Sequence, residues 1–598
     1  MSTSTETKKT VKGGEFLIKE TSFADVYTRD EITEDQKMFV QTASDFIESR
    51  VMPNIQKIDK GDHALVVELV NESAELGLLG ASVPEEFGGL GVDMNTDTFI
   101  NEELGKGHSF TAAFAAHTGI GTLPILYFGT EEQKKKYLPG LANGSIKAAY
   151  CLTEPGSGSD ALGAKTKAVL TEDGKFYIVN GQKMWITNSG FADILTVFVQ
   201  IDGNKFSALI IDAKAEGVSL GAEEDKLGIK GSSTRQVFFN NVKVPVENLL
   251  GEIGKGAKIA FNALNIGRYK LCVFTVGGSK KAITTSVKYA NERIQFNVPI
   301  SSFGAIKHKL AEMAIKTYAN ESATYRVSGM LEDQIEALVA KGTDRVQAKL
   351  KAAEEYSIEC AILKVFGSES IDYIVDESVQ IFGGTGFSEE YPVARAYRDA
   401  RINRIFEGTN EINRLLAVGM LVKKALKGEL DLLTPAMAVQ KELMSVPDFG
   451  SGDSDDFFAA EKKALQNAKK AILMTAGAAV QKFMQNLEKE QEIIMDISDM
   501  LIELFVCESV LLRTEKVISV RGEAGAALQI DMAKTYISDS LERINLSGKH
   551  AITAFNEGDT LRIMLMGLKR FTKYEPINTT AARRRIAEKI VEENQYPF

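Results

Sequence analysis

The chain is poor in cysteine and histidine and carries no excess of basic residues. Its four cysteines are widely separated without a Cys-x-x-Cys pair, which argues against a disulfide framework or a zinc site. The five histidines form no His-Glu-x-x-His motif, so we predict no metal site. With a formal net charge of −11, the chain lacks the concentrated lysine and arginine that nucleic acids require, and no nucleic-acid partner is expected.

Long apolar runs are also missing. No stretch approaches the roughly 20 apolar residues that a membrane-spanning helix needs. The first residues are polar, contain Glu6 and lack arginine, unlike a secretory signal or a mitochondrial transit segment. We therefore expect a cytoplasmic protein, attached at most peripherally to the inner face of a membrane.

What is present points to several globular domains. A chain of 598 residues is longer than the length that usually forms a single hydrophobic core. Its 44% hydrophobic and 25% charged residues are typical of globular proteins. We predict an α+β fold that is mainly α. The expected parts are a flexible segment (1–30), a helical domain (31–147), an antiparallel β domain (148–254), a second helical domain (255–430), a linker (431–456) and a C-terminal helical extension (457–598).

Local patterns support this division. Leu65, Val66, Leu69 and Val70 recur at helical spacing in the first helical domain. In the β domain, residues 175–179 form a β-rich run between Asp173-Gly174 and Asn180-Gly181, two dipeptides typical of hairpin turns. Residues 445–456 are rich in Pro, Gly, Ser and Asp, which favours a linker.

The extension begins with a helical stripe of apolar residues. Ala464, Leu465, Ala468 and Ile472 lie on it, whereas Lys469 and the other lysines of this segment lie off it. No glycine-rich dinucleotide fingerprint follows a predicted strand, so a nicotinamide cofactor is not expected.

Four segments carry residues suited to chemistry. Residues 150–160 (YCLTEPGSGSD) form a loop whose backbone N–H groups can hold an anion or the edge of a flat ring. On a strand, Trp185 and Thr187 would face one side. Residues 380–387 (QIFGGTGF) allow a close approach of backbone to a ligand. Taken alone, residues 150–160 fit an ordinary turn better and Trp185 fits a core position better, whereas residues 380–387 fit a turn between helices and a ligand contact equally.

The fourth segment, residues 405–412 (IFEGTNEI), places Glu407 just before a helix that Thr409 is suited to cap. Together, and in this order, the four segments resemble the acyl-CoA dehydrogenase family over residues 31–426. The resemblance implies FAD as cofactor, acyl-CoA as substrate and Glu407 as the base that removes the α proton. In one branch of the family the base precedes the residue matched by Arg268, where this chain has Gly267, which cannot act.

The resemblance assigns further roles residue by residue. The implied flavin contacts are Tyr150, Leu152, Thr153, Ser159, Trp185, Ile186, Thr187, Arg293, Gln295, Phe296, Gln380, Gly383, Gly384, Thr409 and Glu411. The implied substrate contacts are Ser159, Asn265, Arg268, Gly408, Ala112 and Ala116. Most members carry glycine where this chain has Asn297, which leaves the shape of that loop open.

The extension makes the chain similar to the very-long-chain branch of the family, and it implies a homodimer. Small side chains near Ala112 and Ala116 would leave room for a long acyl chain, although packing around alanines explains them as well. The resemblance implies α,β-dehydrogenation of long-chain acyl-CoA to trans-2-enoyl-CoA in β-oxidation, with electrons passed to an electron-transfer flavoprotein. An acyl-CoA oxidase and a non-catalytic respiratory-complex assembly scaffold are the alternatives.

The sequence does not decide whether the pKa of Glu407 is raised or lowered. Burial next to Phe406 would raise it, and the following helix N-terminus would lower it.

Overall fold

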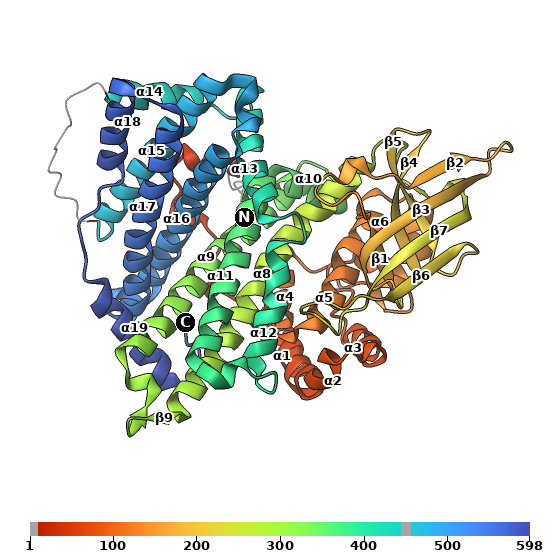
Figure 1. The fold of residues 1–598 in the computed structure, drawn as a ribbon, viewed down its shortest axis with the longest axis horizontal. Helices are drawn as coiled ribbons and strands as arrows, with labels where there is room; N and C mark the ends of the chain where they lie inside the picture. Colours follow the sequence, from red (N-terminus) through yellow and green to blue (C-terminus); the bar gives the residue numbers. More distant parts are fainter. Residues whose placement is uncertain (1–9, 444–455) are drawn as a thin grey trace, which may run out of the picture.

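Helices make up most of the molecule, and a β domain lies at one end (Figure 1). The computed structural model describes residues 10–443 and 456–598. The predicted linker sequence 445–456 lies outside the described residues except for Asp456, and residues 1–9 lie outside them as well.

The helices and strands follow one another along the chain in four groups. The first group contains α1 (Glu34–Phe46), α2 (Ile55–Asp59), α3 (His63–Glu75), α4 (Met94–Leu104), α5 (Ser109–Ala116), α6 (Leu123–Phe128) and α7 (Glu131–Ala142). The second contains β1 (Ala148–Cys151), β2 (Lys167–Leu170), β3 (Phe176–Thr187), β4 (Ile194–Ile201), β5 (Lys205–Asp212), β6 (Val218–Glu223), β7 (Thr234–Pro245) and β8 (Leu249–Leu250). The third contains α8 (Gly256–Glu292), β9 (Ile294–Gln295), β10 (Val298–Pro299), α9 (Gly304–Val339), α10 (Arg345–Glu355), α11 (Ser357–Phe382), α12 (Pro392–Ala400) and α13 (Asn410–Leu426). The fourth contains α14 (Leu433–Leu443), α15 (Ala459–Phe483), α16 (Gln491–Gly525), α17 (Ala527–Phe555), α18 (Gly558–Phe571) and α19 (Thr579–Glu593).

The β domain departs from the prediction in two ways. Its main sheet runs β6-β7-β3-β2-β4-β5-β8, with β1 beside β4, and the β1–β4 and β2–β4 pairs are parallel rather than antiparallel. Asp173-Gly174 does turn the chain between β2 and β3, but Asn180-Gly181 does not. It produces an irregularity in the register of β3 against β7, because glycine suits a bulge as well as a turn.

Three long helices, α8, α9 and α11, form the centre of the molecule (Figure 1). Helices α8 and α11 run in the same direction. A β-carbon at Gly367 would touch Cys272, and further along the ring of Phe382 stacks on that of Tyr289 with centroids 3.9 Å apart. This parallel course allows two helices to line one long cavity.

The C-terminal extension, helices α14–α19, packs against α9 and α13. Helix α14 falls within residues 431–456, which were predicted as linker, and its Val439 is buried. Lys469 was expected off the apolar stripe, yet it is buried and its Nζ lies 2.6 Å from Glu508 Oε1. The ion pair with Glu508 of α16 stabilises the buried ammonium. The spacing of apolar residues within α15 alone could not predict this partner.

The described part of the segment 1–30 is packed, whereas flexibility was expected. Phe16 is buried and its ring lies 5.0 Å from that of Phe505 in α16. The backbone N–H of Gly14 donates a hydrogen bond of 2.7 Å to Glu359 on α11. The segment therefore lies between the central helices and the extension.

Within the described ranges, no helix is both long enough and apolar enough to cross a bilayer. The four cysteines are buried and form no disulfide bond.

Candidate active site

Glu407 lies in the short loop between α12 and α13, in a conformation that few side chains adopt. Its φ is 59° and that of Gly408 is 80°, both in the left-handed region. The conformation costs a glutamate about 1–2 kcal/mol, so surrounding contacts must hold it. The Nε–H of Arg268 donates to the backbone oxygen of Glu407 at 3.1 Å, and the side-chain amide of Asn413 donates to that of Gly408 at 2.8 Å.

Glu407 is partly buried, and one oxygen of its carboxylate is fully enclosed. Its Oε2 has no hydrogen-bond partner among the described residues. Burial raises the pKa of Glu407 to about 7, while the positive charges of Arg268 and Lys364 oppose the rise. Desolvation therefore outweighs the two nearby positive charges, and the pKa of Glu407 is raised overall.

Gly267 provides the space that this carboxylate occupies. A β-carbon added at position 267 would lie 2.5 Å from Glu407 Oε2, closer than real contacts allow. The next residue, Arg268, is buried and donates from Nη1 to Asn265 Oδ1 at 2.9 Å. Asn265, Arg268, Glu407 and Gly408, all predicted site residues, are thus brought together.

A cavity of about 410 Å³ opens beside Glu407. On α8 its lining begins at Gly267 and continues to Thr285, which corresponds to about 27 Å of helix at 1.5 Å per residue. The predicted residues Ala112 and Ala116 line it from α5, and Thr187 lines it from the end of β3. Glu407 therefore sits at the side of a long, mostly apolar channel.

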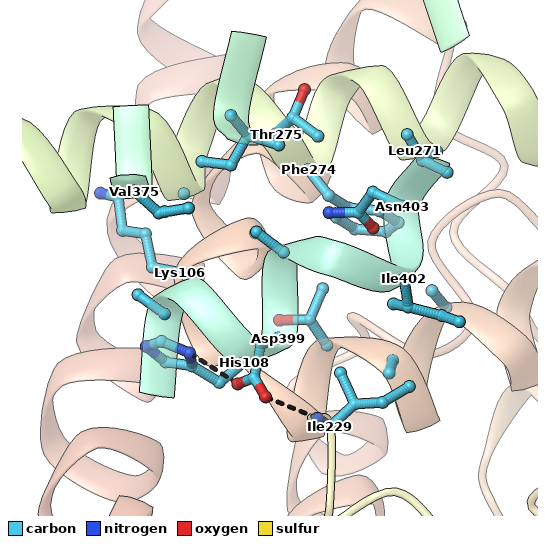
Figure 2. Close-up of a pocket in the computed structure, with 18 of the residues that line it drawn as sticks. Lys106, His108, Ile229, Leu271, Phe274, Thr275, Val375, Asp399, Ile402 and Asn403 are labelled. Carbon is cyan, nitrogen blue, oxygen red and sulfur yellow. Dashed lines mark hydrogen bonds and ion pairs between the residues drawn. The ribbon is translucent and has the colours of Figure 1, made fainter. Parts of the chain in front are cut away.

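Figure 2 shows part of this cavity. His108 Nδ1 lies 3.0 Å from Asp399 Oδ2, and Asp399 Oδ1 accepts a hydrogen bond of 2.5 Å from the backbone N–H of Ile229. These contacts tie the loop of the β domain that contains Ile229 to α12 and to the start of α5. They fix the wall of the cavity on the side of the β domain.

The predicted ring-binding residues lie on the β domain. Trp185 has a φ of 60° and a side chain that is 52% exposed, and the register of β3 shifts between Lys183 and Ile186. Ile186 is buried, so Trp185 and Thr187 are the accessible residues on either side of it. Among the other predicted contacts, Tyr150 and Leu152 are buried and Ser159 is exposed.

The loop that contains Leu152 and Thr153 is fastened to β3. The ammonium of Lys183, which is fully buried, donates to Leu152 O at 3.2 Å and to Glu154 Oε1 at 2.7 Å. The backbone N–H of Met184 donates to Thr153 O at 2.9 Å. These contacts hold residues 152–154 against the part of β3 that precedes Trp185.

A second set of predicted contacts lies elsewhere in the chain. Arg293, Gln295 and Phe296 are at the end of α8, about 39 Å of helix rise beyond Gly267. Gln380, Gly383 and Gly384 lie beside them, because Phe382 stacks on Tyr289. Phe296 is 85% exposed in the tight turn between β9 and β10. Asn297 has a φ of 65° there, so asparagine adopts the left-handed conformation that glycine would supply. One chain does not bring the two sets together.

Comparison with known proteins decides the family. Residues 33–145 match the acyl-CoA dehydrogenase N-terminal domain, residues 149–242 match its middle domain, and residues 254–420 and 467–570 match acyl-CoA dehydrogenase C-terminal domains. A probable acyl-CoA dehydrogenase of Bacillus subtilis (strain 168) is 49% identical over 587 residues, covering 98% of both chains. The chain belongs to the acyl-CoA dehydrogenase family.

Two other comparisons bear on the extension. A crystal structure of an acyl-CoA dehydrogenase complexed with FAD, from Bacillus anthracis, has 48% identity and a TM-score of 0.96, and the match covers 98% of this chain and all of that one. The mitochondrial very long-chain specific acyl-CoA dehydrogenase of Macaca fascicularis is 39% identical over 418 residues, which are 66% of this chain and 61% of that protein. The predicted family and the mainly α fold with an added C-terminal helical domain are confirmed.

This acyl-CoA dehydrogenase also contains site residues that the sequence did not reveal. Lys364 on α11 is fully buried, its Nζ donates to Asn410 Oδ1 at 2.7 Å, and its charge interacts with that of Glu407. Thr409 caps α13 as predicted, accepting from Ile412 N at 3.3 Å. The one available signal was a lone lysine in the apolar run 361–366, since buried lysines are almost always paired. Among the described residues no His, Cys, Asp and Glu side chains gather in a metal-binding group.

Proposed function

We propose that this enzyme catalyses the FAD-dependent α,β-dehydrogenation of acyl-CoA thioesters, with Glu407 as the base that removes the α proton. One observation supports this most strongly. The Glu407 carboxylate is buried beside a long apolar cavity, its Oε2 has no hydrogen-bond partner among the described residues, and its pKa is raised to about 7. A base with a pKa near the working pH is suited to proton abstraction.

The residues of the β domain fit a flat ring cofactor. Trp185 offers a half-exposed indole surface, Thr187 a hydroxyl at the cavity wall, and residues 152–154 an anchored loop edge. We infer that they hold the isoalloxazine of FAD, the cofactor that the Bacillus anthracis structure contains. Bound flavin would supply the acceptor for the β hydride.

The loop that contains Glu407 also positions the substrate. The left-handed conformations at Glu407 and Gly408 turn the carboxylate toward Gly267 and leave the backbone of Gly408 next to it. We infer that the thioester lies along this loop. Arg268 stabilises the loop through the backbone oxygen of Glu407, and the apolar cavity wall excludes water from the proton that is removed.

The cavity favours a long acyl chain. The small residues Ala112, Ala115, Ala116 and Gly119 line one wall of it, together with Thr111 and Ile120 of the same segment. Each buried methylene contributes about 0.8 kcal/mol, so a long apolar channel selects for chain length. The similarity to a very long-chain specific relative supports the same preference.

Two copies of the chain would complete the cofactor site. The predicted contacts at the end of α8 lie far from Trp185 and Thr187 in the same chain, and Phe296 and Phe387 are 85% and 89% exposed there. We infer a homodimer in which the end of α8 of one copy contacts the flavin adenosine held by the other. Transfer of electrons to an electron-transfer flavoprotein, a role in β-oxidation and a cytoplasmic location with at most peripheral membrane attachment remain predictions from the resemblance.

An anaerobic titration tests the proposal. The purified enzyme is mixed with acyl-CoAs of increasing chain length while the flavin absorbance is followed. Wild type should bleach with long chains, and Glu407→Gln should bind the same ligands with reduction slowed by about 10²–10⁴-fold. Reduction by no acyl-CoA would overturn the proposal and favour the assembly scaffold. Rapid reoxidation of reduced enzyme by oxygen would favour the oxidase.

A further inference from the structure

Helix α13 begins three residues after Glu407, and polar contacts fasten its first residue, Asn410, to α11. Asn410 is buried, and its Oδ1 accepts from Lys364 Nζ at 2.7 Å and from Ser368 Oγ at 3.2 Å. Its Nδ2 donates to Glu369 Oε1 at 2.9 Å. Asn410 thus uses both ends of its amide to fix the helix start that follows the base.

The contacts continue to the C-terminal extension. Arg414 lies one turn further along α13 and donates from Nη1 and Nη2 to Glu369 at 2.8 and 3.0 Å. Its Nε donates to Asp499 Oδ1 on α16 at 2.7 Å. One guanidinium therefore joins α13, α11 and the extension in a planar, bidentate geometry that lysine could not reproduce.

We propose that the C-terminal extension positions the catalytic base through a chain of side chains, Asp499–Arg414–Glu369–Asn410–Lys364. These five are positioning residues. The inference rests on the proposed role of Glu407 and adds that an extension outside the cavity contributes to catalysis. Without Asp499, Arg414 loses its ion pair with α16, and its guanidinium is held by Glu369 alone.

The conformation of Glu407 explains why such support is needed. Glu407 is strained in the left-handed region and persists there only when neighbouring structure holds it, whereas Gly408 adopts the same region without strain. Arg268 and Asn413 hold the backbone oxygens of the loop, and the proposed chain holds its downstream end. A displacement of about 1 Å at a reacting group can slow catalysis by about 10²-fold, so small losses of support are measurable.

Lys364, at the inner end of the chain of side chains, also acts on Glu407 through its charge. The titratable and charged groups that face Glu407 are Arg268 of α8, Lys364 of α11 and Tyr150 of β1. The protonated form of Lys364 lowers the pKa of Glu407 against the effect of burial, and burial lowers the pKa of Lys364 itself to about 7. Removing that ammonium should raise the pKa of Glu407, and loosening Asn410 should weaken the same effect.

The outer end of the chain is suited to substitution. The side chains of Asp499 and Glu369 are 38% and 41% exposed, whereas that of Arg414 is 12% exposed, so a substitution at Asp499 changes the edge of the core and opens no cavity within it. Asp499→Asn preserves the shape of the side chain. A matched control exists within the extension, where Asp531 of α17 binds Arg585 of α19 in a bidentate pair at 2.6 and 2.7 Å.

The experiment compares Asp499→Asn, Lys364→Met and the control Asp531→Asn in the FAD-loaded full-length enzyme. Single-turnover flavin reduction by palmitoyl-CoA is measured against pH, and backbone hydrogen exchange of residues 408–413 is measured without substrate. We expect Asp499→Asn to slow reduction about tenfold and to speed exchange, while Asp531→Asn changes neither. Lys364→Met should shift the pH profile upward by on the order of one unit.

Two outcomes would overturn the inference. One is an Asp499→Asn enzyme that matches Asp531→Asn in both reduction rate and exchange. The other concerns the double variant that combines Asp499→Asn with Arg414→Gln. Once Arg414→Gln has broken the chain of contacts, Asp499→Asn should slow reduction little further, so effects of the two substitutions that add fully would contradict the inference. The exchange measurement needs no turnover. A wild type that no acyl-CoA reduces would therefore overturn the proposed function without deciding whether the extension holds the loop.

Discussion

Gly267 of α8 and Glu407 of the α12–α13 loop share one small volume, in which the missing side chain of the first makes room for the carboxylate of the second. The two residues are far apart in the sequence, and a β-carbon on Gly267 would come within 2.5 Å of Glu407 Oε2. Helix α8 therefore provides the space for Glu407, although α8 itself carries no base at this position.

Gly267→Ala should displace the carboxylate of Glu407. We expect flavin reduction to slow by at least about tenfold, because the added methyl group occupies the position of Oε2. Stopped-flow reduction with palmitoyl-CoA measures the effect. The control is Gly419→Ala on α13, where a β-carbon meets nothing within 4 Å. Equal rates in both variants would contradict the assigned position of the base.

The pH dependence of reduction should follow the ionisation of Glu407. Burial raises its pKa to about 7, and only the carboxylate can accept the α proton. The rate should therefore rise with pH through about 7 and level off above it. The measurement is single-turnover reduction between about pH 5.5 and 9. A flat profile across that range would indicate an ordinary carboxylate pKa.

Ala116→Phe should shift the chain-length preference. A ring at this position would fill part of the cavity beyond Glu407, while the space beside the base stays open. Losing room for two or three methylenes lowers affinity for a long chain by about 2 kcal/mol. Reduction of the same variant by a short-chain acyl-CoA serves as the control and should change little. A similar loss for short and long chains would mean that the alanines serve helix packing.

Glu359→Gln should change the pH dependence of stability. Burial raises the pKa of Glu359 to about 7, above its value in the unfolded chain, so the native state binds the proton more tightly. The resulting stabilisation is complete below the unfolded pKa and is lost as pH rises through about 7. Glutamine can still accept the hydrogen bond from Gly14. We expect the melting temperature of the variant to rise relative to that of wild type as pH increases from about 4.5 to about 7, and the difference to level off above pH 7. A difference that is constant between pH 4.5 and 7 would refute the assignment.

The sequence predicted features that depend on short segments. Thr409 caps α13 because its side chain acts within four residues, and Asp173-Gly174 turns the chain for a local reason. Asn180-Gly181 was misassigned because a bulge and a turn use the same conformations. Lys469, Lys364 and Asp499 owe their surroundings to partners on other elements, so nothing local marks their roles.

The packing of Phe16 on Phe505 places the beginning of the chain against one of its last long helices. During synthesis the ribosome releases the first residues long before α16 exists. Phe16 and Leu17 therefore remain exposed to solvent until most of the polypeptide, including α16, has been synthesised. Deletion of the residues through Phe16 should leave Phe505 without this ring contact, and a chain that ends before α16 should leave Phe16 exposed.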